Sequence, residues 1–266
     1  DDLRKWYETW YAPNNATLVV VGDVQPAAVK ALAEQYFAAI PARALPPTRL
    51  PLELPEPGER SMTLRLPGKV PALYIGFNVP SRNSGSAADA DSLRMLLGVM
   101  DGGISARLET RLVREKRIAA AIASSYDAFA RGDSLFGIRA VPAPGHSLDE
   151  LQAAILSEIE SLKTEKIEPD ELSRVYASFL SSDVFARDSI QEQADSIGRL
   201  ESVGQSWRMM DEWPLALKKV TADDVRAAAV KFLVPARRTV LRLEPTALAT
   251  TNKAGDEKAR AAGGQP

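Results

Sequence analysis

Zinc and nucleophile chemistry need residue types that this sequence almost entirely lacks. The chain has a single histidine, His146, and no cysteine. A lone imidazole builds neither a structural zinc site of His and Cys ligands nor the paired histidines of a catalytic one. Ser147 follows His146 directly, but adjacent residues do not provide the geometry of a catalytic triad, and Ser147 suits the N-cap of the helical pattern after it. The sequence therefore predicts no catalytic residue and no metal site of its own.

The pair Gly102-Gly103 precedes a helical pattern, and helix N-termini can bind anions through free backbone N–H groups. Phosphate-binding loops carry further spaced glycines or a Gly-Lys-Ser/Thr ending, and this stretch has neither. We therefore interpret the two glycines as a tight turn between helices, which glycine permits because it has no Cβ.

A dense group of cations follows the glycine pair: Arg107, Arg111, Arg114, Lys116 and Arg117. Guanidinium groups at this density could hold a carboxylate or the carbonyl groups of a bound peptide. The competing interpretation is a helix surface laced with ion pairs to the many carboxylates of the chain. Both interpretations stay open at the level of sequence, which also pairs no two carboxylates into an acid and a base.

Composition describes a folded protein and excludes several classes of partner. Hydrophobic residues make up 45% of the 266 residues and charged residues 26%, with a net charge of -2. Acidic and basic residues are interleaved, so no basic stripe predicts nucleic-acid binding. No apolar run approaches the roughly 20 residues that cross a bilayer. The absence of cysteine permits export without indicating it, and the start on Asp1-Asp2 rather than methionine suggests a processed or truncated start.

The first part of the chain reads as strand, turn and helix. Residues 17–21 are rich in β-branched types, and Pro26 suits the first turn of a helix whose apolar stripe, ending at Ile40, is expected to pack on a sheet. Six prolines lie between Pro41 and Gly58, which excludes a persistent helix or central strand. We interpret this stretch as an interdomain linker, with a long surface loop as the alternative.

The rest of the chain predicts an α+β domain. Strands are expected at 61–66 and 72–79, forming one hairpin, at 118–126 and 134–141, forming a second, and at 238–243. Helices are expected at 87–100 and 105–116, and further helices begin after Ser147, at Pro169 and after Thr221. Ser147 with Glu150, and Thr221 with Asp224, have the spacing of capping boxes. From residue 246 onward the periodicity ends, and we expect a disordered tail.

Three stretches together resemble the pitrilysin and insulinase family of zinc metallopeptidases, which includes mitochondrial processing peptidase and its non-catalytic relatives. Residues 10–24 (WYAPNNATLVVVGDV) are similar to a segment shortly after the family's active-site region. Residues 102–108 (GGISARL) with 112–116 (LVREK) resemble a helical stretch of its second domain, and residues 220–225 (VTADDV) resemble the start of its closing helix.

The resemblance implies a two-layer α/β sandwich of the mitochondrial processing peptidase type, with an antiparallel-rich sheet and helices on one face. It divides the chain into the end of the first, catalytic-type domain (1–45), the Pro-rich linker (46–57), a second domain without metal (58–245) and the tail (246–266). The family's inverted zinc motif, His-x-x-Glu-His, is absent. In family order it lies before Asp1, so truncation and true loss explain the absence equally well.

Family members also grip the peptide near the metal with an arginine and, seven residues on, a tyrosine of the second domain. Arg114 matches the arginine, but Ala121 stands at the tyrosine position. Tyr126 lies five residues further along, and on a strand this odd offset points it to the opposite face. Arg114 is therefore the one substrate-binding candidate, with ion pairing on the helix surface as the alternative.

These observations lead to two hypotheses. In the first, the chain is the C-terminal portion of a zinc endopeptidase, completing a peptide-binding chamber while zinc is bound in the missing N-terminal part. In the second, it belongs to a non-catalytic subunit that pairs with an active homologue. The expected partners are that N-terminal half or subunit and a peptide substrate. The chain alone is expected to be inactive and free of stoichiometric zinc, and family habit suggests the bacterial periplasm or envelope.

Overall fold

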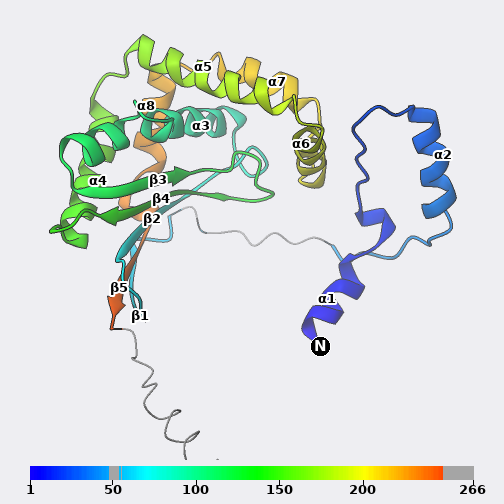
Figure 1. The fold of residues 1–266 in the computed structure, drawn as a ribbon, viewed down its shortest axis with the longest axis horizontal. Coiled ribbons are helices and arrows are strands. Elements are labelled where there is room, and N and C mark those ends of the chain that lie inside the picture. Colours follow the sequence, from blue (N-terminus) through cyan, green and yellow to red (C-terminus); the bar gives the residue numbers. More distant parts are fainter. Residues whose placement is uncertain (48–53, 55, 248–266) are drawn as a thin grey trace, which may run out of the picture.

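The computed structural model describes residues 1–47, 54 and 56–247. A five-stranded sheet with helices on one of its faces forms the main body, and the N-terminal segment extends away from it (Figure 1). The strands are β1 (Arg60–Pro67), β2 (Ala72–Val79), β3 (Ala119–Ser125), β4 (Ser134–Pro142) and β5 (Arg238–Thr246). The helices of the body are α3 (Ala87–Asp101), α4 (Leu148–Thr164), α5 (Pro169–Ala186), α6 (Ile190–Ser202), α7 (Met209–Leu217) and α8 (Ala222–Phe232).

The sheet has the order β1-β5-β2-β4-β3, and every pairing is antiparallel except that of β1 with β5. The predicted hairpin of β3 and β4 is confirmed. The predicted hairpin of β1 and β2 is wrong, because the two edges of β2 are occupied by β4 and β5 and leave no hydrogen-bonding groups for β1. The last strand of the chain is inserted between the first two, a non-local pairing that no local turn signal encodes.

The covered face of the sheet holds the core. The alternation predicted for β2 is confirmed, since Leu73, Ile75, Phe77 and Val79 are all fully buried. They form one cluster with side chains from the other central strands and from α3, α4 and α8. Burial of each such side chain contributes on the order of 1.5 to 3 kcal/mol. The fold is therefore the expected α+β arrangement with helices on one face of an antiparallel-rich sheet.

The helix boundaries follow their capping residues. The Ser147 hydroxyl accepts a hydrogen bond from the Glu150 backbone N–H, the Glu150 carboxylate accepts one from the Ser147 backbone, and Thr221 and Asp224 form the second predicted capping box. Pro169 occupies the first turn of α5, as expected. The helix predicted at 105–116 is present as residues 107–115, and its part η2 (Glu109–Glu115) has the wider π-helical hydrogen bonding.

The N-terminal segment contains α1 (Asp2–Trp10), the 3-10 turn η1 (Pro13–Asn15) and α2 (Pro26–Phe37). The helix expected from Pro26 is confirmed, but its packing on a sheet is not, because α2 has no buried residue. Residues 17–21 form no strand, since no strand of the described ranges supplies the backbone hydrogen bonds that a strand needs. Parts of the predicted linker (48–53 and 55) and most of the predicted tail (248–266) lie outside the described residues.

Candidate functional site

The cation cluster after Gly102-Gly103 is used mainly for internal ion pairs. Arg107 binds Glu171 of α5 with two hydrogen bonds, Nε to Oε1 at 2.8 Å and Nη2 to Oε2 at 2.7 Å, and its side chain is only 9% exposed. Arg111 binds Glu158 and Glu165 at 2.9 and 2.8 Å, and Lys116 binds Glu158 at 2.7 Å. A hydrogen bond to Glu165 raises the pKa of Arg111 above its usual value.

These contacts answer the question that the sequence left open for three of the five cations. The ion-pair interpretation is confirmed for Arg107, Arg111 and Lys116, although their partners lie on α4, on α5 and between those helices rather than on the same helix. The network of ion pairs joins the helix at 107–115 to α4, to α5 and to the segment between them. Each of these three cations is thus already paired with a carboxylate of the chain itself.

Arg114 differs from its neighbours because no carboxylate of the described residues pairs with it. Its exposed guanidinium donates to the Ile104 carbonyl and to the Thr110 hydroxyl. A cation held by two neutral acceptors keeps donors and its full charge for another ligand. The role of Arg114 in substrate binding therefore remains a proposal with a suitable local environment.

Ala121 and Tyr126 lie in different environments, and Tyr126 follows the end of β3 rather than lying on it. Ala121 is exposed on β3, beside a bulge at the edge of the sheet. The Tyr126 hydroxyl donates to the Pro80 carbonyl at 2.7 Å, and its ring stacks on Phe136 with centroids 6.2 Å apart. Burial raises the pKa of the Tyr126 phenol. This ring is part of the packing, so it does not replace the phenol missing at Ala121.

The residues that sequence reasoning assigned to turns and caps have those roles. The His146 ring lies 3.6 Å from the Glu150 carboxylate in the loop before α4. Gly103 has a φ of +115°, and a Cβ at Gly102 would meet the Gly98 carbonyl oxygen at 2.3 Å.

Within the described residues no group of His, Cys, Asp and Glu side chains could hold a metal ion. The donor set therefore does not fit zinc, and no step of zinc chemistry is assigned to this chain.

The open face of the sheet carries a broad, shallow groove of about 1060 Å³. Its lining comes from all five strands and is predominantly apolar, with Tyr74 and Leu135 as prominent exposed side chains. Gly76 of β2 lies directly opposite Gly137 of β4, so the middle of the groove lacks side chains. The Arg139 guanidinium lies 5.6 Å from the centroid of the Tyr74 ring, a cation–π contact at the side of this hollow.

Sequence reasoning missed this groove, although part of its signal was present. The alternation in β2 that buries Leu73 and Ile75 necessarily turns Tyr74 and Gly76 to the other face. Nothing local indicates that Gly76 and Gly137 lie opposite each other on neighbouring strands, because their pairing depends on register.

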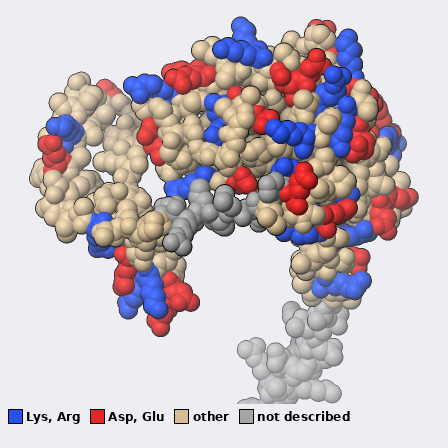
Figure 2. All heavy atoms as spheres, turned by 180° about the vertical axis from the view of Figure 1, so that it is seen from behind, with Lys and Arg blue, Asp and Glu red and all other residues tan. Residues whose placement is uncertain are grey.

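Positive and negative side chains are interspersed over the face of the body shown in Figure 2, which agrees with the interleaved charges of the sequence.

Comparison with known proteins places the chain in a family. Residues 1–179 match the model of the peptidase M16 inactive domain. The chain belongs to this family. It is 29% identical over 205 residues to the zinc protease PqqE of Helicobacter pylori, which covers 76% of the chain and 42% of that protein. It is 27% identical over 240 residues to the uncharacterized zinc protease SCO5738 of Streptomyces coelicolor, covering 86% and 50%. The chain thus spans half or less of the length of these curated relatives.

Solved structures show the same fold. A protease from Helicobacter pylori superposes with a TM-score of 0.83 at 22% identity, covering 92% of the chain and 59% of that structure. The periplasmic protease PqqL from Escherichia coli superposes with a TM-score of 0.74 at 16% identity, covering the whole chain and 31% of that structure. The match to the M16 inactive domain thus confirms the resemblance to this peptidase family. No helix of the described residues has the length and hydropathy to span a membrane.

Proposed function

We propose that this M16 inactive domain is the non-metal portion of a zinc endopeptidase and that the open face of its sheet forms one wall of the peptide-binding chamber. The observation that carries the proposal is an apolar groove, on a sheet face that no helix of the described residues covers, in a domain whose curated relatives are zinc proteases. The groove crosses the sheet face, where the backbones of the central strands are already paired, so it would contact a peptide through side chains, and the hollow at Gly76 and Gly137 leaves room for one bulky side chain. Zinc and its general base belong to the part of the parent protein outside this chain.

The exposed apolar residues of the N-terminal segment support a missing neighbour. Leu32, Tyr36, Phe37 and Ile40 are between 45% and 66% exposed although they form the stripe expected to be buried. A stripe of this kind needs an apolar surface to cover it. We assign that surface to the catalytic-type domain, so residues 1–45 complete that domain, residues 46–57 link it, and residues 58–245 form the second domain.

The proposal is tested in the full-length parent by filling the hollow without disturbing the fold. A Cβ at Gly76 would meet only Leu135 Cδ2 at 3.8 Å, an ordinary contact, and valine suits a strand better than glycine. Gly76→Val is expected to raise KM for peptide hydrolysis roughly tenfold with kcat and zinc content unchanged, because it removes uniform binding. Gly68→Val is the matched control, since a Cβ at Gly68 also makes only ordinary contacts and Gly68 lies outside the groove. An unchanged KM for Gly76→Val would reject the proposal that the open face of the sheet forms a wall of the peptide-binding chamber.

The alternative is a non-catalytic subunit that binds peptide for an active homologue, and Ala121 favours it because the phenol of the family's Arg–Tyr pair is missing. Arg114→Ala separates the two functions. In an active parent it raises KM with zinc retained. In a binding subunit it weakens peptide affinity while the parent itself contains no zinc. Metal analysis of the purified 266-residue chain is expected to give no stoichiometric zinc, and about one tightly bound ion per chain would contradict this.

We also propose that the parent functions in the periplasm or cell envelope. The support is the periplasmic protease PqqL of Escherichia coli among the structural relatives, together with a chain that contains no cysteine. Fractionation of cells that produce the full-length protein tests this, with recovery in the spheroplast cytosol as the contrary result.

A further inference from the structure

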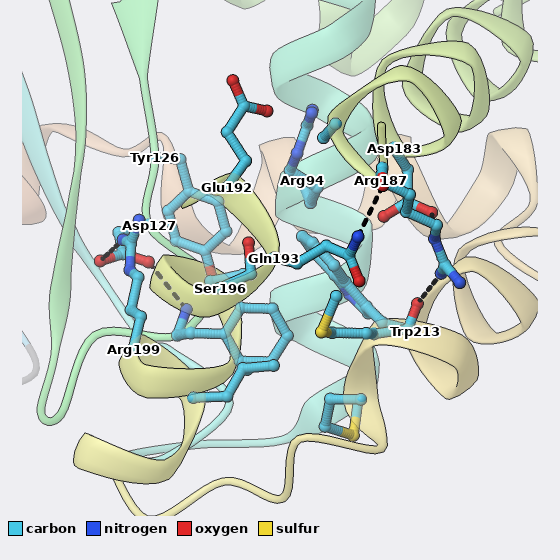
Figure 3. Close-up of a pocket in the computed structure, with 16 residues that line it drawn as sticks. Arg94, Tyr126, Asp127, Asp183, Arg187, Glu192, Gln193, Ser196, Arg199 and Trp213 are labelled. Carbon is cyan, nitrogen blue, oxygen red and sulfur yellow. Dashed lines mark hydrogen bonds and ion pairs between the residues drawn. The ribbon is translucent and has the colours of Figure 1, made fainter. Parts of the chain in front are cut away.

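A second cavity, of about 270 Å³, lies on the helical side of the molecule and shares no lining residue with the groove on the open sheet face. Side chains from α3, α5, α6, α7 and residues 126–129 surround it (Figure 3). Ligand pockets usually measure roughly 300 to 1,000 Å³, so this cavity suits a small ligand or one residue of a larger one.

Arg94 of α3 lines this cavity, and its guanidinium forms no salt bridge with any of the described residues (Figure 3). Among the described residues no group accepts a hydrogen bond from its guanidinium, and its contact is with the ring of Phe179, 5.2 Å away. The other two cations of the lining are neutralised, Arg187 by Asp183 and Arg199 by Asp127. Burial lowers the pKa of Arg94, as expected for a charge taken from water without compensation.

The other residues that line the cavity indicate which further groups a ligand could have. The Ser196 hydroxyl makes no hydrogen bond within the described residues and is available to a polar group. Phe129, Leu200 and Trp213 form an apolar wall, and the Trp213 ring is fixed because its Nε1 donates to Asp91 at 2.8 Å. The Glu192 carboxylate, exposed near the start of α6, adds a negative charge to the lining, so each further negative charge on a ligand is increasingly unfavourable. The lining therefore favours one carboxylate on a compact apolar group over a dicarboxylate or a phosphate.

We propose that this cavity is a binding site for a monocarboxylate carried on a compact apolar group, with Arg94 binding the carboxylate and the wall at Trp213 holding the apolar part. The C-terminal residue of a peptide and a small aliphatic acid both have this chemistry. Arg94 recognises it because a guanidinium presents parallel N–H donors to the two oxygens of a carboxylate. The site does not depend on the function proposed for the open sheet face.

The test compares two probes that differ only in charge, N-acetyl-leucine and N-acetyl-leucinamide, by calorimetric titration of the 266-residue chain. N-acetyl-leucine is expected to bind roughly tenfold to a hundredfold more tightly than the amide, the range for a charge-assisted hydrogen bond. The indole N–H signal of Trp213 in a ¹H–¹⁵N spectrum is expected to shift on binding. 4-Methylpentanoate distinguishes the sources: weaker binding than N-acetyl-leucine assigns the site to a peptide C-terminus, and equal binding assigns it to a small acid.

Variants connect the affinity to Arg94. Arg94→Gln is expected to lose the same tenfold to hundredfold, and Arg94→Lys, which keeps the charge but not the fork, is expected to lose less. Arg226→Gln is the control, because Arg226 pairs with Asp223 on the surface of α8, outside the cavity. Circular dichroism verifies the fold, and Arg94→Lys carries the test if Arg94→Gln fails to fold. Equal binding of acid and amide, wild-type affinity in both Arg94 variants, or no binding by the wild type up to about 10 mM overturns the proposal.

Discussion

Gly98 lies where α3 crosses α5, and replacing it with alanine tests the packing between these helices. A Cβ built on Gly98 would lie 2.2 Å from Cγ1 of Val175 and 3.4 Å from its Cβ. Carbon atoms in ordinary contact are about 3.5 to 4.0 Å apart, so one of the two helices must move or Val175 must change rotamer. A β-branched side chain in a helix has one strongly preferred χ1 rotamer, which makes the second response costly.

Two opposing effects set the magnitude of Gly98→Ala. Alanine in a helix interior is favoured over glycine by about 0.8 to 1 kcal/mol. Overpacking a closely packed contact costs about 1 to 3 kcal/mol, and an overlap of more than 1 Å belongs in the upper part of that range. We therefore expect a net loss of about 1 to 2 kcal/mol. For a domain of this size that loss lowers Tm by about 2 to 8 °C.

A double-mutant cycle by urea and thermal unfolding measures the clash itself. Val175→Ala alone is expected to cost about 1 to 2 kcal/mol for the methyl groups removed. In the Val175→Ala background the clash is gone, so Gly98→Ala is expected to become neutral or stabilising, with a coupling energy of about 2 kcal/mol. If Gly98→Ala stabilises the wild-type chain, or if the two changes are additive, the close approach of α3 and α5 does not exist as described.

Three further predictions follow from the ion pairs and caps. Arg107→Met is expected to cost about 2 to 3 kcal/mol in urea unfolding, since it leaves the partly buried Glu171 unpaired, and adding Glu171→Leu should restore part of the loss; no recovery would contradict this. Ser147→Ala is expected to lower Tm through a lost cap of about 1 kcal/mol, and an unchanged Tm would argue against the cap. The hydrogen bond from Arg111 lowers the pKa of Glu165 from the usual range of a glutamate. Its contribution to stability is therefore fully present above the usual glutamate pKa and is lost as the pH falls through the lowered one, and Glu165→Gln should flatten the decline.

The local elements could be predicted because their signals are local. Ser147 and Thr221 begin helices with their own side chains, and alternation along β2 selects Leu73 and its neighbours for the core. The predictions that failed concern contacts with distant partners. The strand at 17–21 needs a neighbouring strand that the described residues do not provide, and the expected β1–β2 hairpin is interrupted by β5.

By itself the sequence determined that this chain has neither the paired histidines nor the cysteines of the common zinc sites, since it contains one histidine and no cysteine. Only the tertiary structure decided which arginines remain available for ligands. Arg107 and Arg111 meet carboxylates more than 40 residues away, whereas Arg94 and Arg114 meet none among the described residues. Likewise Gly76 and Gly137 form a hollow only because the register of β2 and β4 places them opposite each other. Residue types decide which metal-ligating groups a chain can offer. Whether a charged side chain or a hollow is available to a ligand depends on which distant segments of the chain pack beside it.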